Sequence, residues 1–252
     1  MMLEVREVYR SYKKTGNGFR RERLNVLNGV SFSIRAGECV GLVGESGSGK
    51  STISRLILGL EKADKGSIFI EGKRVSEWIK ENKGQMSVVF QDYTSSANPR
   101  YKISDVIGEL LKAFGENEGI HGKVEHLLEK VGLPLSIANR YPHELSGGQL
   151  QRVCIARAIS MHPRLLILDE AISSLDVSIQ AQIMDLFYKI KKEMNMTILF
   201  IAHDLQAVAH LCDKVMFLHN GQIVEQIATS NLTDVQNEYA RRLLYSVIPF
   251  NV

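Results

Sequence analysis

The sequence predicts an α/β fold, in which a mostly parallel sheet covered by helices carries an antiparallel β subdomain and an inserted helical subdomain. Three observations predict it. Short apolar runs alternate with helical patterns. Two strand–turn–strand patterns stand apart from these runs, and the stretch 92–155 holds helical patterns without a convincing strand. The chain has 252 residues, 44% of them hydrophobic, which excludes collagen, a disordered chain and a disulfide-dense module.

The parallel strands are predicted from four apolar runs that lie near turn signals. These runs are CVGLVG (39–44), MSVVF (86–90), LLILD (165–169) and MTILFIA (196–202). Helices are predicted where apolar residues recur at the spacing of one helix face. One such face holds Ile53, Leu56, Ile57 and Leu60, and another holds Ile179, Ile183, Leu186 and Ile190.

Two antiparallel hairpins are predicted outside the parallel sheet. The segment 67–75 has a turn at Glu71-Gly72, and the segment 215–226 has Asn220-Gly221 between two apolar runs. Asn-Gly tolerates positive φ at both positions, which suits a two-residue hairpin turn.

The chain is expected to form one domain over residues 1–252 with internal subdivisions. Residues 1–91 and 156–225 are expected to form the α/β core with its β subdomain. The stretch 92–155 is the expected helical subdomain, and 226–252 is a short C-terminal extension.

The strongest motif is GESGSGKS at 44–51, here called the phosphate loop, which fits the P-loop pattern G-x-x-x-x-G-K-[ST]. Its glycines let the backbone N–H groups converge on an anion, and the following helix adds the positive end of its dipole. Lys50 supplies a charge for the terminal phosphates of a nucleotide, and the Ser51 hydroxyl can bind Mg²⁺. The expected nucleotide-binding residues of the loop and helix start are Gly44, Glu45, Ser46, Gly47, Ser48, Gly49, Lys50, Ser51 and Thr52.

A second motif, LLILDE at 165–170, brings two acids to the carboxyl end of a strand, where open α/β sheets bind ligands. Asp169 is expected to hold Mg²⁺. Glu170 is expected to act as the general base that polarises an attacking water.

A third motif, LSGGQLQR at 145–152, places Ser146 and two glycines at the start of a predicted helix. This is a second arrangement suited to phosphate. The spacing leaves three possibilities open: the turn binds its own nucleotide, it completes the site of another chain, or it is a plain serine cap of a helix.

Together, the phosphate loop, the LSGGQ turn and the LILDE strand, in this order, resemble the ATP-binding subunits of ABC transporters. The resemblance covers about residues 3–225 and implies a P-loop NTPase core of the RecA-like type. It also implies ATP and Mg²⁺ as cofactors and a head-to-tail dimer of ATPase domains. ATP would lie between the phosphate loop of one chain and the signature turn of the other, made of Ser146, Gly147, Gly148 and Gln149.

The resemblance assigns roles to further residues. Tyr12 matches the ring that stacks on adenine, and Gln91 matches the glutamine that reaches Mg²⁺ and the attacking water. His203 matches the switch histidine that contacts the γ-phosphate. Asp176, in Ser174-Leu175-Asp176, matches the loop that touches the partner site. Glu170, His203 and Gln91 are thus the expected catalytic residues.

The residues after Glu170, Ala171-Ile172-Ser173-Ser174, are similar to the peptide and nickel importer branch of this family. Gln91-Asp92, the run RVCIARA at 152–158 and the short tail are most similar to nickel-import subunits, with peptide import as the alternative. The resemblance implies a second, related ATPase subunit, two transmembrane permeases and an extracytoplasmic solute-binding protein as partners. It implies the cytoplasmic face of the membrane as location, with the segment 92–104 docking on a permease.

Other functions fit the sequence less well. A net charge of +3 is too small to indicate nucleic acid, and the basic residues in the loop 13–23 suit a solvated loop. A soluble ATPase of the chromosome-maintenance type needs long coiled coils, but no sustained heptads lie between Lys50 and Ser146. A ribosome-associated relative usually carries two phosphate loops in one chain, whereas this sequence has one. A small-molecule kinase would leave the LSGGQ turn without a role.

Overall fold

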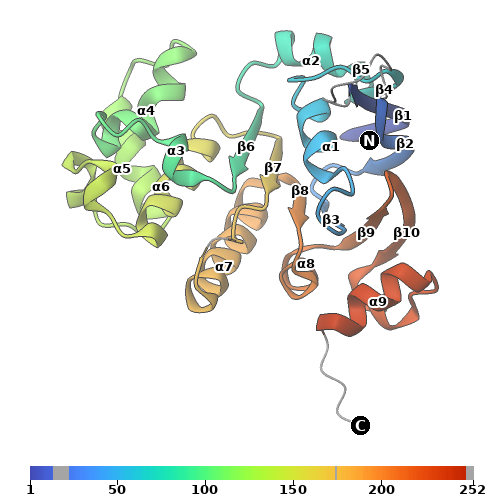
Figure 1. Ribbon diagram of the computed structural model, residues 1–252. Coiled ribbons are helices and arrows are strands. Elements are labelled where there is room, and N and C mark those ends of the chain that lie inside the picture. Colours follow the sequence, from blue (N-terminus) through green and yellow to red (C-terminus); the bar gives the residue numbers. More distant parts are fainter. Residues whose placement is uncertain (14–22, 174, 248–252) are drawn as a thin grey trace. The chain divides into compact units, whose positions relative to one another are not determined.

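Figure 1 shows the computed structural model of the chain, which describes residues 1–13, 23–173 and 175–247. Ser174 and residues 14–22 of the basic loop lie outside the described residues, so the expectations for them stay predictions. The chain folds into two compact units, Met1–Glu81 together with Thr197–Val252, and Asn82–Met196. The finer subdomain bounds expected from the sequence stay predictions.

The first unit contains an antiparallel sheet with the strand order β2-β1-β4-β5. The predicted turn at Glu71-Gly72 is confirmed: it joins β4 to β5, with φ values of 48° and 77°. Strands β1 and β2 were not expected from the sequence. The bounds are β1 Leu3–Lys13, β2 Arg23–Ile34, β4 Lys65–Ile70 and β5 Lys73–Arg74.

The first unit also contains the strands β10, β9, β3 and β8, in this order. β3 pairs in parallel with β8 on one side and with β9 on the other. β9 and β10 form the predicted hairpin around Asn220-Gly221, whose φ values are 48° and 74°. β3 and β8 are buried along their whole length, as their apolar runs predict. The bounds are β3 Cys39–Val43, β8 Thr197–Ala202, β9 Lys214–His219 and β10 Gln222–Ala228.

Helix α1 follows β3 and buries most of the predicted apolar face, but not all of it. Ile53, Leu56 and Ile57 are buried, whereas Leu60 is 66% exposed. The prediction for Leu60 was wrong because the helix ends at Ile57, just before Gly59 takes a φ of 70°. The helices of this unit are α1 Lys50–Ile57, α2 Val75–Glu81, α8 Leu205–Leu211 and α9 Glu238–Val247, with the 3₁₀ helix η3 Thr229–Asp234.

The second unit is built on two parallel strands, β6 (Met86–Phe90) and β7 (Leu165–Asp169), both with the predicted bounds. The described elements between these strands are all helical, as the pattern of 92–155 predicts (Figure 1). They are α3 Tyr93–Ser96, α4 Ile103–Ala113, α5 Ile120–Lys130, η1 Leu135–Asn139, η2 Pro142–Glu144 and α6 Gly147–Ile159.

Helix α7 (Val177–Met194) follows β7 and confirms the second predicted helix face. Ile183, Leu186 and Ile190 are buried, and Ile179 is half-buried. Across the part of the chain that the structure describes, no helix combines the length and the apolar character needed to span a membrane.

The packing of α8 on β3 requires a glycine. A Cβ at Gly41 would lie 2.3 Å from Cγ1 of Val208, so one of the two elements would have to move. We expect Gly41→Ala to lower the free energy of unfolding by about 1–3 kcal/mol, the usual cost of overpacking. Chemical unfolding followed by circular dichroism measures it.

Gly122 in α5 offers a matched control, because a Cβ there would meet no atom within 4 Å. Gly122→Ala should raise the free energy of unfolding by up to about 1 kcal/mol, since alanine restricts the unfolded chain. Equal stability of Gly41→Ala and the wild type would contradict the close packing at β3.

Candidate active site

The phosphate loop lies in the first unit and joins the end of β3 to the start of α1. Two of its glycines are required by close approach. A Cβ at Gly44 would lie 2.3 Å from the carbonyl oxygen of Leu218, and one at Gly49 would lie 2.7 Å from Cδ2 of Leu27. Gly49 also has a φ of 111°, which other residues rarely adopt. The loop is therefore pressed against β9 and β2.

The start of α1 suits an anion. Its N-cap, Gly49, gives no side-chain hydrogen bond, and its first turn has no acidic residue. The N–H groups of this turn thus keep their capacity to donate, and the helix dipole favours negative charge there. Within the described residues, the buried hydroxyl of Ser48 has no hydrogen-bond partner. The Ser51 hydroxyl belongs to an exposed residue, so it can reach a metal ion bound with a phosphate.

Lys50 and His203 are brought together in this unit. The Lys50 side chain is buried, and its Nζ donates to the carbonyl oxygens of Gly44, at 2.8 Å, and Glu45, at 3.1 Å. The same Nζ lies 3.5 Å from Nδ1 and 3.4 Å from Nε2 of His203, which follows β8 and is exposed. A lysine charge and an imidazole thus lie together beside the loop that suits an anion.

Tyr12, the residue expected to stack on adenine, lies at the end of β1 and is held by two partners. Its hydroxyl donates to Oε2 of Glu61 at 2.6 Å, and the Arg10 guanidinium lies 4.7 Å from the centre of its ring. Burial raises the pKa of Glu61, but hydrogen bonds from Tyr12 and Arg10 outweigh it and lower the pKa below its usual value. Glu61 is therefore a carboxylate that holds the Tyr12 ring. The sequence reasoning missed it because its partners are distant in the chain.

The second unit brings Gln91, Asp169 and Glu170 to one edge of its sheet. Phe90 pairs with Asp169 in parallel register, so Gln91 and Glu170 follow at the same level of neighbouring strands. Glu170 has a φ of 53°, a strained conformation for a residue with a side chain. Glu71 and Asn220 have a similar φ in hairpin turns, so this value shows a tight turn of the backbone at the end of β7.

The loop after Glu170 is held by side chains that the sequence reasoning missed. Nε2 of the buried Gln151 donates to the Ala171 carbonyl at 2.6 Å. Nε2 of Gln180 donates to the carbonyls of Ile172 and Leu175, both at 3.0 Å. The only sequence signal for Gln151 is that it occupies a position of α6 that would otherwise suit an apolar residue.

The LSGGQ turn begins α6 and forms a capping box. Ser146 Oγ accepts from the Gln149 N–H at 3.3 Å, and Gln149 Oε1 accepts from the Ser146 N–H at 3.0 Å. Gly147 and Gly148 are packed closely, since a Cβ would lie 2.8 Å from Tyr93 Oη and 3.1 Å from Ile179 Cγ2, respectively. Ser146 remains exposed, so the cap leaves its hydroxyl accessible to a phosphate. Asp176 is also exposed, at the N-cap of α7.

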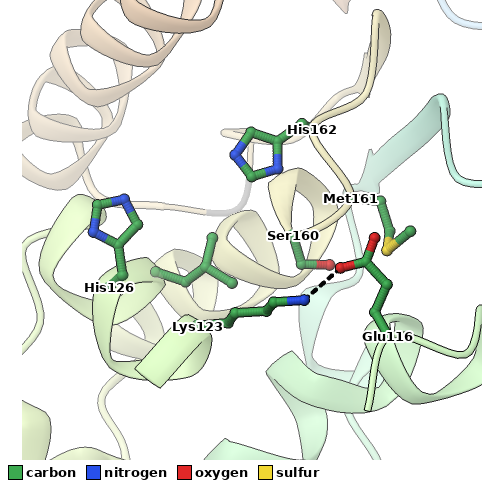
Figure 2. A pocket seen from close by; sticks show the side chains of 7 residues that line it. Glu116, Lys123, His126, Ser160, Met161 and His162 are labelled. Atoms are coloured by element: carbon green, nitrogen blue, oxygen red, sulfur yellow. Dashed lines mark hydrogen bonds and ion pairs between the residues drawn. The ribbon is translucent and has the colours of Figure 1, made fainter. Parts of the chain in front are cut away.

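A separate pocket of about 130 Å³ lies in the helical part of the second unit and contains no predicted site residue (Figure 2). Lys123 reaches across it to Glu116, which lowers the pKa of that carboxyl. The rings of His126 and His162 also line it, but within residues 1–13, 23–173 and 175–247 no three His, Cys, Asp or Glu side chains gather as a metal site would require. The candidate residues lie elsewhere: in the first unit on the phosphate loop and after β8, and in the second unit at the ends of β6 and β7 and at the start of α6.

Known proteins match this chain along most of its length. A family model described as ABC transporter matches residues 27–173. The metal-staphylopine import system ATP-binding protein CntF of Staphylococcus aureus (strain NCTC 8325 / PS 47) is 41% identical over 99% of this chain and 100% of its own length. The oligopeptide transport ATP-binding protein OppF of Lactococcus lactis subsp. lactis (strain IL1403) is 41% identical, with 98% of this chain and 80% of that protein covered.

The nickel import ATP-binding protein NikE of Rhodospirillum rubrum is 38% identical over 98% of this chain and 92% of its own length. Among solved structures, the dimeric post-hydrolysis state of the ATP-binding cassette MJ0796, bound to ADP and Pi, is 27% identical with a TM-score of 0.79. It covers 90% of this chain and 99% of that one. The predicted α/β fold with a P-loop core is thus confirmed as that of an ATP-binding cassette.

Proposed function

Because the chain belongs to the ABC transporter family, we propose that it is the ATP-hydrolysing motor subunit of an importer. The observation that carries the proposal is the buried Lys50 ammonium, which is held beside an uncapped helix start and the imidazole of His203. This arrangement suits the terminal phosphates of ATP.

Nucleotide binding is assigned to the phosphate loop and the start of α1. The N–H groups around Gly49 donate to the phosphates, and the Lys50 ammonium pairs with the terminal ones. Tyr12, held by Glu61, offers a ring for the adenine. Ser51, Gln91 and Asp169 carry the oxygen ligands that suit Mg²⁺, an ion that neutralises phosphate charge when it is bound.

Hydrolysis is assigned to Glu170, His203 and Gln91. Glu170 accepts a proton from the attacking water as general base. The His203 imidazole, beside Lys50, contacts the γ-phosphate, and Gln91 orients the water from the neighbouring strand. The position of Glu170 depends on the loop that follows it. Gln151 and Gln180 hold this loop through hydrogen bonds to its carbonyl groups.

A second ATPase subunit completes each site. The Ser146 hydroxyl and the N–H groups at the start of α6 face the nucleotide of the partner, and Asp176 contacts the partner site. The dimeric state of the related cassette MJ0796 supports this assembly. We propose that the second subunit is a related but different ATPase, so that the pair is a heterodimer, as the resemblance to the peptide and nickel importer branch implies.

The motor works at the cytoplasmic face of the membrane, bound to two permeases that receive cargo from an extracytoplasmic solute-binding protein. The segment 92–104 after Gln91 is the proposed permease contact. Asp92 caps the short helix α3 there by accepting from the Ser95 N–H at 3.0 Å. Hydrogen bonds from Thr94 and Ser95 lower the pKa of Asp92 to about 2, so the cap stays ionised at a pH where an ordinary aspartate would be protonated.

Nickel or a related metal ion is the proposed cargo. The support is similarity: Gln91-Asp92 and the run RVCIARA at 152–158 resemble nickel-import subunits, and relatives named for metal-staphylopine and nickel import are 41% and 38% identical to this chain. Peptide import is the second candidate, because its subunit reaches the same 41% identity as the metal-staphylopine one.

Lys50→Ala should weaken the binding of Mg-ATP by about 10- to 100-fold, as the loss of a charge-assisted hydrogen bond predicts. Calorimetry on the purified chain measures it. Lys65→Ala is the control, since Lys65 is an exposed lysine of β4 in the same unit. Wild-type affinity in Lys50→Ala would contradict the assigned site.

Glu170→Gln should keep ATP binding but slow hydrolysis by about 10²- to 10⁴-fold, the usual contribution of a general base. Phosphate release by the assembled transporter is the measurement. Glu129→Gln, on the exposed side of α5, should leave the rate unchanged. A Glu170→Gln protein that hydrolyses ATP at the normal rate would refute the role of this carboxylate.

The cargo is tested by uptake in a strain that lacks the chain. Radiolabelled Ni²⁺, offered alone and with a staphylopine-type chelator, should no longer accumulate, and a labelled dipeptide should accumulate as before. The wild-type chain should restore nickel uptake, whereas Glu170→Gln should not. Loss of dipeptide uptake with normal nickel uptake would overturn the metal proposal in favour of the peptide one.

A further inference from the structure

The C-terminal helix α9 reaches the phosphate loop through Tyr239. The Tyr239 hydroxyl accepts a hydrogen bond from the backbone N–H of Glu45, with a distance of 2.9 Å from nitrogen to oxygen. Neither the motifs nor the expected roles include this residue. The contact joins the second residue of the loop to a helix at the far end of the sequence.

The bonded N–H belongs to the same peptide group that holds Lys50. The carbonyl of this group, that of Gly44, accepts from Lys50 Nζ at 2.8 Å. A peptide group is planar, and its N–H and C=O point in opposite directions. Fixing the N–H on Tyr239 therefore fixes the direction of the carbonyl, and with it the position of the ammonium.

The Tyr239 ring has firm supports of its own. It stacks on His219 at the end of β9, with ring centres 3.9 Å apart. The Asn237 side chain accepts from the N–H of Tyr239 at 3.0 Å, and the Asn237 N–H donates to Glu225 of β10 at 2.8 Å. Contacts to β9, to β10 and at the start of α9 thus fix the position of the Tyr239 side chain.

We propose that Tyr239 is a positioning residue of the nucleotide site, which sets the place from which Lys50 reaches the terminal phosphates by holding the peptide group between Gly44 and Glu45. The inference rests on the proposed ATPase function. Through Tyr239, the helix α9, which contains none of the motifs, contributes to the affinity for ATP.

Tyr239→Phe removes only the hydroxyl and keeps the ring on His219. In the assembled transporter, it should raise the KM for ATP by about 2- to 10-fold, the contribution of one neutral hydrogen bond. The kcat should stay within about twofold of the wild type, because the hydroxyl assists binding and not the chemical step. A general loss of structure would instead lower the active fraction and the apparent kcat.

Two further variants make the test specific. Tyr245→Phe carries the same change on the same helix and should leave KM unchanged. In a Lys50→Ala background, Tyr239→Phe should add less than about twofold to the loss of ATP affinity, since the two residues act through one peptide group.

An unchanged KM in Tyr239→Phe, an equal rise in Tyr245→Phe, or full additivity with Lys50→Ala would each overturn the positioning role. Failure of the wild-type chain to bind Mg-ATP would overturn the proposed function itself and this inference with it. Normal binding by the wild type and weak binding by Lys50→Ala separate the two kinds of failure.

Discussion

The position of one buried ammonium group is the constraint on which the candidate site depends. A buried charge costs free energy unless polar groups replace the water that it loses. For Lys50, the carbonyls of Gly44 and Glu45 do so, and His203 lies beside the same nitrogen. The loop must therefore curl tightly enough to turn two carbonyls toward a side chain that starts only six residues later. The same loop is packed closely against β9, because a Cβ at Gly44 would lie 2.3 Å from the Leu218 carbonyl oxygen.

The parts of the fold that follow from local pattern could be predicted. The strands β6 and β7 have the expected bounds, because an apolar run of five residues near turn signals is long enough for a strand and too short for a typical helix. Strands β1 and β2 were missed because β1 mixes charged and apolar residues and its register shifts between Val5 and Val8, which breaks the alternation. Glu7, with a φ of 49°, lies within this irregular stretch.

The residues of the candidate site, too, could be predicted only in part. The residues that would touch the nucleotide lie in short motifs, since phosphate binding needs several groups at fixed spacing. The residues that hold these motif residues in place have no such fixed spacing. Glu61 holds Tyr12 and Gln151 holds the loop after Glu170, each through one long-range hydrogen bond. Such a partner is chosen by the tertiary fold, and a sequence does not show which polar residue the fold will bring to a given position.

The phosphate loop keeps its shape through contacts from distant parts of the chain. Two of the three glycines of the loop, Gly44 and Gly49, are needed for close approach and bring no side chain that could brace the loop. Its support must come from outside, and the structure provides it from β9 through Leu218 and from α9 through Tyr239. Since His219, next to Leu218, also carries the Tyr239 ring, the two supports are one packed unit. Substitutions far from the motifs, in β9 or α9, can therefore reach the nucleotide through the backbone of the loop.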